Sequence, residues 1–467
     1  MQRLSGMDAS FLYSETPTGH MHVTGVILAD ASTMPEEYEF DRVKAMIRDR
    51  LHLMPIFRRR IVEVPFSVDH PLWIEDPDFD LDQHVHRVRL APPGGRAELT
   101  DLVGDLASRP LDRSRPLWEM WVAEGAADGT IALITKMHHA AIDGVTGADL
   151  MSQLFDFPPD SPAPEPETEP WVPDRVPNDT KLFTDSVVSW MSDPFRAVRA
   201  AARTVSSLAA VAQATIGGDA DGPSAALPFT APRTMFTRSL TPRRSVAFGQ
   251  ADLDDFKAVK NAFGCKINDV VLATCSIALR SYLLDHDDLP DQPLVVMCPV
   301  SVHGQGGEAE GTNLVSSMAV HLPVHVEDPV AQLELIREDT KAAKEMQNAM
   351  GADLLQDITQ FAPPVLFNQA MRLYSRSRLA DRHRPVQNGV ISNVPGPPIP
   401  LYVVGAEVIA VYPLGPLIEG AGLNLTVISN RGNMDFGIIA CPELAPDIDT
   451  VAVAWEDAVR TLRKAAG

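Results

Sequence analysis

Residues 134–147 read ITKMHHAAIDGVTG, and the rest of the chain is best interpreted outward from this stretch. The apolar character of residues 130–139 predicts a strand, and the Asp-Gly pair that follows predicts a tight turn. Apolar residues then recur at helical spacing, so a helix is expected after the turn. His138 and His139 therefore stand at the corner between a strand and a helix.

The two adjacent histidines are expected to have different surroundings. Neighbouring residues on a strand point to opposite faces, which argues against one metal ion shared by His138 and His139. A neutral imidazole facing a cleft is a suitable general base, while its neighbour packs inward. Asp143 is expected to cap the helix or pair with an arginine, and Gly144 to permit the turn. From these residues alone, a catalytic pair and a structural pair both remain open.

Composition limits the class of protein. A chain of 467 residues, 45% hydrophobic and 22% charged, predicts a soluble globular protein of two or three units. A formal net charge of −22 argues against nucleic acid as a partner. The four cysteines form no C-x-x-C pair and lie in apolar surroundings, which predicts a reduced, cytoplasmic protein. No secretory signal and no spanning segment are expected, because long apolar runs are missing.

Strands and helices are expected to mix without strict alternation, in two α/β or α+β lobes. The predicted lobes cover residues 1–156 and 236–467, with a connector and helical crossover over 157–235. Eight of the 21 residues from Phe157 to Pro177 are proline, which is typical of an extended, solvated connector. In the following Ala-rich segment three arginines recur at helical spacing and form either a solvated face or a lipid-facing surface: Arg196, Arg199 and Arg203.

The expected elements are as follows. In the first lobe, strands are expected at 20–30, 57–64, 71–75, 118–125 and 130–139, and helices at 37–52 and 97–108. In the second lobe, a strand and two helices are expected from residue 243, a strand at 294–302, helices near 328–348 and 365–379, and a strand-rich finish.

Several short strings together carry a family resemblance. HHAAIDG at 138–144 resembles the HHxxxDG signature of the CoA-dependent acyltransferase superfamily. PLW at 116–118, NDVVLA at 268–273 and SNVPGP at 392–397 resemble the bacterial wax ester synthase/diacylglycerol acyltransferase family, as does the opening LSGMDASFLYSE. The resemblance extends over nearly the whole chain.

The resemblance implies a two-lobed fold of the chloramphenicol-acetyltransferase type with a channel between the lobes. The expected reaction moves a long acyl chain from acyl-CoA, a co-substrate, to a lipid hydroxyl without any cofactor. Diacylglycerol is the expected acceptor, and triacylglycerol the product; a long-chain alcohol giving a wax ester is the alternative. In this family the second histidine is the base, which maps onto His139, with His138 supporting it. Because a thioester is already activated, no metal and no covalent acyl-enzyme are expected.

Further candidates have both a functional and a structural interpretation. Oxyanion or channel donors are expected among Asn268, Asn424 and Thr426, although Asn268 is as well explained as a helix cap and Thr426 as an ordinary strand residue. The motif residues are Pro116, Leu117, Trp118, Asp269, Ser392, Asn393, Pro395 and Gly396. Trp118 is expected to anchor the core, and the Pro-Gly-Pro string to make a rigid turn. Four basic residues are candidates for the CoA phosphates, or for a solvated face: Arg243, Arg244, Lys257 and Lys260.

The remaining expectations concern rivals and surroundings. The enzyme is expected in the cytoplasm, held peripherally at a membrane or lipid-droplet surface. The rivals are a polyketide-associated or condensation-type acyltransferase and a lipid-surface protein with a vestigial site. His303 stands where the family commonly has an arginine, so any bracing by that arginine must differ here.

Overall fold

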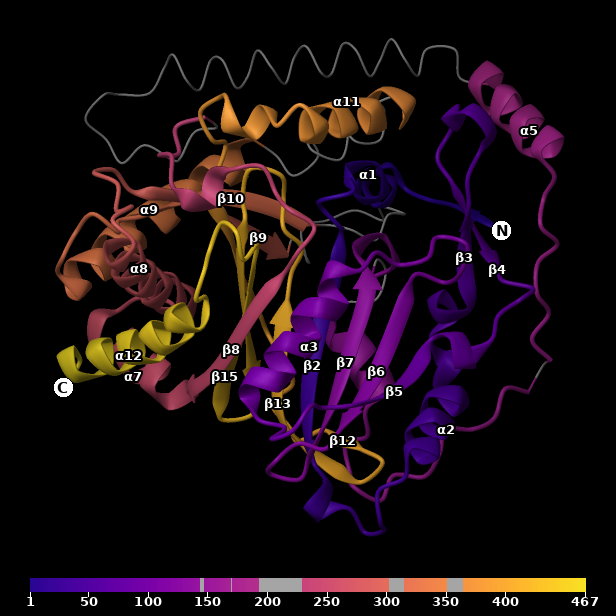
Figure 1. The fold of residues 1–467 in the computed structure, drawn as a ribbon, viewed down its shortest axis with the longest axis horizontal. Helices are drawn as coiled ribbons and strands as arrows, with labels where there is room; N and C mark the ends of the chain where they lie inside the picture. The colour runs from indigo at the N-terminus through magenta and orange to yellow at the C-terminus, as the bar shows by residue number, and fades with distance from the viewer. Residues whose placement is uncertain (143–146, 169, 193–228, 302–314, 351–363) are drawn as a thin grey trace.

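Two mixed sheets with helices around them make up the molecule (Figure 1). The computed structural model describes residues 1–467 except 143–146, 169, 193–228, 302–314 and 351–363. Within that part of the chain, each large sheet has six strands, and a third sheet has three.

The first sheet contains the strand that leads to the two histidines. Its strand order is β12-β13-β2-β7-β6-β5. The strands are β2 His22–Asp30, β5 Val85–Arg89, β6 Trp118–Glu124, β7 Thr130–His138, β12 Tyr402–Val403 and β13 Ala406–Leu414. β7 lies between β2 and β6, both antiparallel to it, and His22 pairs with His138. A strand covered on both faces is expected to carry a run of apolar residues, as β7 does from Ile131 to Ile134.

Two strands of this sheet come from the far end of the chain. β13 pairs with β2 in antiparallel register, from Glu407 opposite Asp30 to Leu414 opposite Thr24. The exact lobe boundaries stay a prediction. One point differs from the prediction that all of 236–467 belongs to the second lobe. Residues 402–414 belong to the first sheet, because β13 pairs with β2. Without β13, the backbone groups along that edge of β2 would have no hydrogen-bonding partner.

The second sheet has the order β10-β9-β11-β14-β15-β8. Its strands are β8 Ser245–Asp252, β9 Leu294–Ser301, β10 Val315–Leu322, β11 Gly389–Val394, β14 Leu423–Asn430 and β15 Asn433–Ala440. β11 is parallel to β9 and β14, and the other pairs are antiparallel. The helices packed around this sheet are α7 Leu253–Phe263, α8 Ile267–Asp285, α9 Pro329–Met350 and α12 Asp449–Ala465.

Helices fill the space beside and between the two sheets. α2 Phe40–Arg50 packs Val43 and Ile47 against the first sheet. α3 Arg96–Ser108 lies between the sheets, in one cluster with Val26 and Phe248 (Figure 1). The remaining helices are α1 Gly6–Ser14, α4 Gly147–Leu154, α5 Asp179–Ser192 and α11 Pro364–Arg376.

One described helix, α8, is long and apolar enough to cross a membrane by length and composition. In this structure 67% of its apolar stretch is buried. Its residues Val271 and Leu279 belong to the core of the second sheet, together with Trp455 of α12. A helix that is mostly buried in the core is apolar over most of its surface because neighbouring elements cover it.

The Pro-rich connector is extended, and it contacts the first lobe. The three-stranded sheet has the order β1-β4-β3, from β1 Gln2–Arg3, β3 Arg59–Val62 and β4 Leu72–Glu75. Trp171 donates its indole N–H to Glu75 (3.0 Å) and lies under the guanidinium of Arg58. Arg58 also pairs with Glu167 at 2.9 Å. The connector therefore runs along the outer side of the first lobe, held by polar contacts and one tryptophan.

The expected strands and helices agree with most of the observed ones, but five described strands or α-helices were not predicted: β1, α1, β5, β10 and α12. α1 is buried on several sides at Ala9, Leu12 and Tyr13 and shows no single apolar stripe. Its start is marked instead by Ser5, whose side chain accepts the N–H of Asp8. β5 is short, and it lies at the edge of the sheet.

Candidate active site

The corner after β7 is hydrogen-bonded to two other segments of the chain, the PLW string and the residues just before β2. The N–H of His138 donates to the carbonyl of Leu117 (3.0 Å), and the N–H of His139 donates to that of Met21 (2.7 Å). β7 ends at His138, and a short 3-10 helix, η6 His139–Ala141, follows. The two imidazoles thus leave the backbone in different directions, as strand alternation predicts.

His139 lies against helix α1. Its ring stacks on Phe11, with the ring centroids 4.0 Å apart and the planes inclined by 23°. Its Nδ1 is buried and has no hydrogen-bond partner among the described residues. Burial disfavours the charged imidazolium and lowers the pKa of His139 to about 4. The ring is therefore neutral at physiological pH, which is the state that a general base requires.

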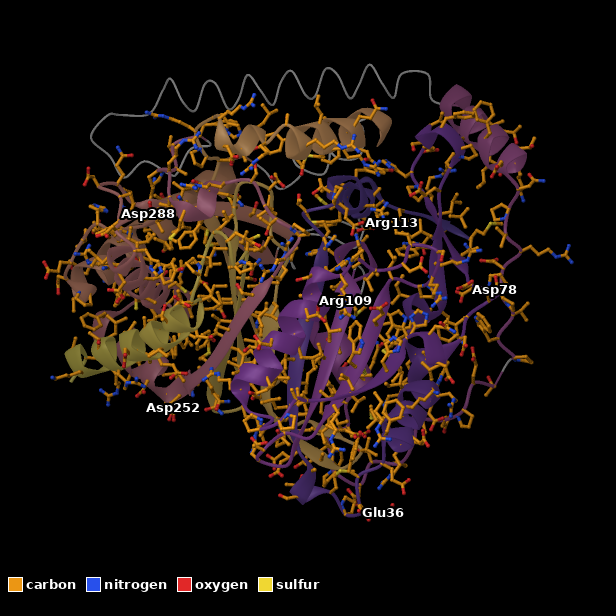
Figure 2. The ribbon with its side chains drawn as sticks, viewed as in Figure 1. Glu36, Asp78, Arg109, Arg113, Asp252 and Asp288 are labelled. Carbon is orange, nitrogen blue, oxygen red and sulfur yellow. The ribbon has the colours of Figure 1, made fainter. Side chains whose placement is uncertain are left out.

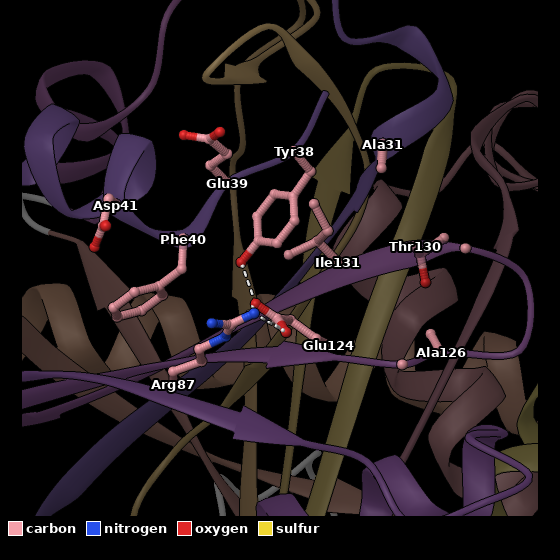
Figure 3. Close-up of a pocket in the computed structure, with 12 residues that line it drawn as sticks. Ala31, Tyr38, Glu39, Phe40, Asp41, Arg87, Glu124, Ala126, Thr130 and Ile131 are labelled. Carbon is pink, nitrogen blue, oxygen red and sulfur yellow. Dashed lines mark hydrogen bonds and ion pairs between the residues drawn. The ribbon is translucent and has the colours of Figure 1, made fainter. Parts of the chain in front are cut away.

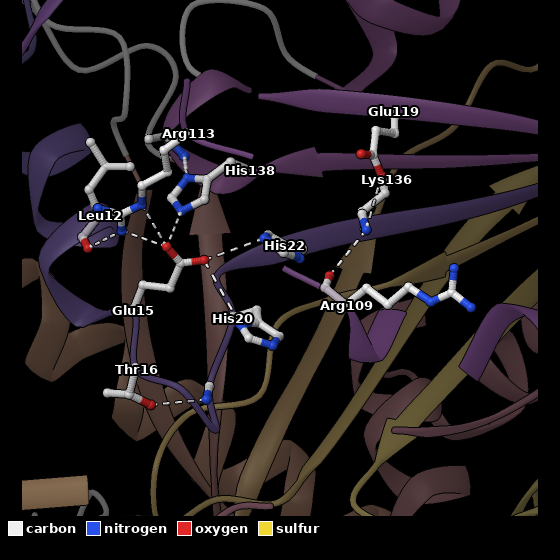
Figure 4. A network of polar contacts seen from close by, with 12 residues as sticks. Leu12, Glu15, Thr16, His20, His22, Arg109, Arg113, Glu119, Lys136 and His138 are labelled. Atoms are coloured by element: carbon white, nitrogen blue, oxygen red, sulfur yellow. Dashed lines mark hydrogen bonds and ion pairs between the residues drawn. The ribbon is translucent and has the colours of Figure 1, made fainter. Parts of the chain in front are cut away.

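His138 points into the protein, where it is part of a polar network (Figure 4). Its Nδ1 accepts the N–H of Ala140 at 3.1 Å, which fixes the ring against the η6 turn. Its Nε2 lies 3.9 Å from a carboxylate oxygen of Glu15. Burial lowers the pKa of His138 well below its usual value. His138 thus braces the corner from the inner side.

Glu15 is the centre of this network, and sequence reasoning did not single it out. Arg113 donates its Nε–H to Glu15 (2.9 Å) and an Nη2–H to the carbonyl of Leu12 (2.8 Å), just below α1 (Figures 2 and 4). His22 Nε2 lies 3.4 Å from Glu15, and His20 Nδ1 lies 4.0 Å away. Burial alone would raise the pKa of Glu15, but His22, His138 and Arg113 outweigh it and lower the pKa to about 2.

Glu15 is part of the opening string LSGMDASFLYSE, so the signal was present in the sequence. Its position beside the end of β7, more than 100 residues further along the chain, could not be read from that string. Two other predicted site residues, Asp143 and Gly144, lie outside the described residues. So do His303 and the arginines Arg196, Arg199 and Arg203.

The PLW string has a structural role in the described geometry. Trp118 is buried and donates its indole N–H to the carbonyl of Phe57 at 2.9 Å. Its ring stacks between Phe57 and His84, with centroid distances of 4.5 Å and 4.7 Å. Pro116 accepts the N–H of Trp118 (2.8 Å), and Leu117 supports His138 as described above. These contacts agree with Trp118 as a core anchor.

Asn268 and Asp269 lie in the first turn of α8. Asn393, from the end of β11, donates to Asn268 across 3.5 Å. Asp269 accepts the N–H of Lys266 (2.8 Å) and the hydroxyl of Thr340 on α9 (2.9 Å). Asp269 therefore caps α8 and ties it to α9, while the amide of Asn268 remains a candidate donor.

Asn424 and Thr426 lie on one face of β14, as expected. Thr426 donates its hydroxyl to Asn424 at 2.9 Å, and Asn424 donates to the carbonyl of Pro416 at 3.0 Å. Ser392 on β11 is in register with Thr426. No contact joins these residues to His139 in the part of the chain that the structure describes, so their catalytic role stays a prediction.

The SNVPGP turn packs tightly against β14. The N–H of Gly396 donates to the hydroxyl of Ser429 at 3.0 Å. A Cβ on Gly396 would lie 1.9 Å from the carbonyl oxygen of Ser429, so only glycine fits here. Pro395, immediately before it, belongs to this rigid turn.

The four basic residues proposed for CoA do not form one group. Arg244 is buried and donates to the carbonyl of Thr18 at 2.6 Å, so it joins the two lobes. Arg243 pairs with Glu443 at 3.4 Å. Lys257 and Lys260 lie on α7, where Lys257 pairs with Asp254 at 2.7 Å. Arg244 is thus committed to structure, and a phosphate-binding role for the others stays a prediction.

A large surface hollow lies away from the histidines (Figure 3). It has a volume of about 660 Å³ and is lined by Tyr38, Arg87 and Glu124, among others. Tyr38 donates to Glu124 at 2.9 Å, and Arg87 donates to it at 2.8 Å. The hollow includes Thr130, the first residue of β7, whereas His139 follows the last. At ~3.3 Å per strand residue the two places are roughly 25–30 Å apart.

Comparison with known proteins supports one family. Residues 4–271 match the model of the wax ester synthase/diacylglycerol acyltransferase catalytic domain, and residues 311–463 match the WS/DGAT C-terminal domain. Two Mycobacterium tuberculosis proteins named as diacylglycerol O-acyltransferases are 40% and 34% identical to this chain. The first alignment covers 99% of this chain and 90% of the relative, and the second covers 100% and 97%.

Solved structures agree with the family models. The wax ester synthase/diacylglycerol acyltransferase from Marinobacter aquaeolei VT8 superposes with a TM-score of 0.72 at 27% identity, over 100% of both chains. The first condensation domain of the calcium-dependent antibiotic synthetase gives 0.56 at 14% identity, over 100% of this chain and 96% of that one. The second similarity concerns the fold alone and confirms the two-lobed α/β architecture expected from the resemblance.

Proposed function

Because this chain belongs to the wax ester synthase/diacylglycerol acyltransferase family and is therefore an acyltransferase, we propose that it transfers a long acyl chain from coenzyme A to the hydroxyl of diacylglycerol. The relatives named for diacylglycerol support this acceptor over a long-chain alcohol. The observation that carries the proposal is His139, a neutral imidazole at the corner after β7, braced by His138 and stacked on Phe11.

In this mechanism His139 acts as general base. An alcohol is too weak an acid to ionise beforehand, so His139 takes the hydroxyl proton while the oxygen attacks the thioester carbonyl. The hydroxyl oxygen bonds to the carbonyl carbon and gives a tetrahedral oxyanion. This oxyanion collapses as the C–S bond breaks, and the proton passes from His139 to the departing thiolate of coenzyme A. No covalent acyl-enzyme is needed. Asn268, Asn424 and Thr426 are the candidates for stabilising the oxyanion.

The test is a turnover assay with purified protein, palmitoyl-CoA and either diacylglycerol or hexadecanol, followed by thiol release. His139→Ala is expected to lose about 10²–10⁴-fold in kcat/KM, because general-base assistance contributes that much. His52→Ala is the matched control, since His52 lies only partly buried in a different 3-10 helix. Near-normal turnover by a folded His139→Ala protein would refute the mechanism.

The acceptor assay separates the two family activities. Faster turnover with hexadecanol than with diacylglycerol would assign the protein to wax ester synthesis instead. A requirement for an acyl group on a carrier protein would favour the condensation-type rival. The proposal also places the enzyme at a lipid surface and in the cytoplasm. The four buried, free cysteines support the cytoplasm as its compartment.

A further inference from the structure

One short segment is strongly basic although the whole chain is acidic. Residues 372–384 read RLYSRSRLADRHR, with five arginines and a single acidic residue, Asp381, in a chain of net charge −22. All five arginines are exposed at the end of α11 and in the turn that follows: Arg372, Arg376, Arg378, Arg382 and Arg384. We refer to these five residues as the arginine face.

Most of the arginine face has no acidic partner among the residues that the structure describes. Arg378 pairs with Asp381 at 2.9 Å. The other four make no ion pair with any residue that the structure describes. Four guanidinium groups in one short segment, with no ion pair in the described part of the chain, favour an anionic partner.

The inner side of the same segment is firmly attached. Ser375 lies within hydrogen-bond distance of Thr18 (3.0 Å), and Tyr374 lies within that distance of His383 (2.6 Å). Arg233 donates to the carbonyl of His383 at 2.7 Å. The inward contacts fix the orientation of α11, so its arginines are directed outward by the fold.

Exposed apolar side chains accompany the arginines. Leu373, next to Arg372, is 65% exposed. Phe66, in a short 3-10 turn that packs against α11, is 82% exposed and stacks edge-on with the 41%-exposed Phe183 of α5. Phe66 has φ = 60°, a left-handed conformation that a bulky residue rarely adopts. α11 and α5 lie along the same edge of the molecule (Figure 1).

We propose that the arginine face, together with Leu373, Phe66 and Phe183, docks the enzyme on an anionic lipid surface. Arginines attract the phosphate head groups, and exposed leucine and phenylalanine side chains enter the boundary with the acyl chains. Net charge −22 would otherwise repel such a surface, so the local positive charge sets the orientation of docking.

The docked orientation brings the lipid close to the candidate base. α11 packs on α1, where Tyr13 contacts Phe367 with ring centroids 6.3 Å apart. α1 in turn carries Phe11, which stacks on His139. α11 and α1 thus lie between the docking surface and His139. This inference rests on the proposed function, because a lipid acceptor is what makes such an approach useful.

The experiment measures binding separately from catalysis. Co-sedimentation with phosphatidylcholine vesicles is compared with vesicles containing phosphatidylglycerol, using the wild-type chain and a variant with Arg372, Arg376, Arg382 and Arg384 changed to Gln. The wild type is expected to bind the anionic vesicles, less tightly as salt rises, and the variant at least tenfold more weakly. Phe66→Ser is expected to weaken binding in a salt-independent way.

The control removes equal charge elsewhere: Arg48, Arg89, Lys344 and Lys464 changed to Gln, all exposed on other elements. Equal loss by this control, or no binding by the wild type, would overturn the docking proposal. A second assay uses a short alcohol in solution, for which the arginine variant should keep wild-type kcat and KM. A raised KM for acyl-CoA with unchanged vesicle binding would assign the arginines to coenzyme A phosphates instead. If the wild type transferred no acyl group to any acceptor, the proposed function would be refuted. Binding of the wild type to anionic vesicles would still support the docking surface.

Discussion

Two residues of the same type, adjacent in sequence, have different environments in this molecule. His138 is the last residue of β7 and faces Glu15, whereas His139 faces the ring of Phe11. The difference follows from strand alternation and from the turn that begins at His139. The proposed chemistry at this corner accordingly assigns the base to His139 and a positioning role to His138.

The pH dependence of the reaction should report the environment of His139. Burial lowers its pKa from 6.5 to about 4, so the neutral form persists until the pH falls toward 4. We expect kcat/KM to stay level from pH 7 down to about 5 and to fall only below that. Initial rates with palmitoyl-CoA, measured at each pH with circular dichroism as the folding control, check this. An acid limb near 6.5 would mean that the ring is exposed to water in the free enzyme.

Trp118 offers a second test at this scale. Trp118→Ala should lower the free energy of unfolding by about 3–5 kcal/mol, because a large buried ring is lost. Trp118→Phe keeps the stacking but leaves the carbonyl of Phe57 without its donor, so a smaller loss of about 1–3 kcal/mol is expected. Urea unfolding measures both. A raised KM for acyl-CoA in Trp118→Phe, without loss of stability, would make Trp118 a substrate contact instead.

At the scale of elements, two close contacts join neighbouring layers of the fold. Lys136 on β7 is buried and donates to the carbonyls of Leu106 (3.2 Å) and Arg109 (3.1 Å), so it caps the end of α3. β13 passes over β15, where Gly437 faces the carbonyl of Pro413. In both cases an element of one sheet lies directly against backbone carbonyls of a different layer.

Gly437→Ala should destabilise the protein through this crossing. A Cβ at this position would lie 2.3 Å from the carbonyl oxygen of Pro413, so β13 or β15 must move. A loss of about 1–3 kcal/mol in the free energy of unfolding is expected. Gly432→Ala is the matched control in the adjoining turn, because nothing lies within 4 Å of its Cβ position. Equal urea midpoints for the two variants would contradict the close approach.

At the scale of the whole molecule, the two lobes are not independent along the chain. Val408 on β13 is fully buried in the same cluster as Ile47 and Leu133 of the first lobe. Without residues 402–414, the outer edge of β2 and this cluster would be exposed to water. Because β12 and β13 come from the C-terminal half of the chain and complete the first sheet, folding of the first lobe depends on the second.

Splitting the chain between Ala163 and Pro164 tests this dependence. Fragment 1–163 alone should not unfold cooperatively, because it lacks β12 and β13. Co-expression of 1–163 with 164–467 should restore a soluble complex with acyl-transfer activity. Size-exclusion chromatography and thermal melting measure the outcome. A sharp thermal transition of 1–163 by itself would show that the first lobe folds without β12 and β13.

Much of this protein is determined by local sequence. Strand alternation and helical spacing predict β2, β6, β7, α2 and α3, because the periodicity of a surface element is written in neighbouring residues. Short strings also predict the family and the corner at His139. Elements without a clear apolar period, such as α1 and β5, cannot be predicted in this way.

Only the tertiary structure decides which distant segments meet. Glu15 beneath His138, Arg244 bonded to Thr18, and β13 paired with β2 all join residues more than 100 positions apart. The five arginines at 372–384 become a surface only when α11 is fixed on α1. Local patterns record which face of an element is apolar. They do not record which partner covers that face, since this depends on the free energy of the whole packed chain.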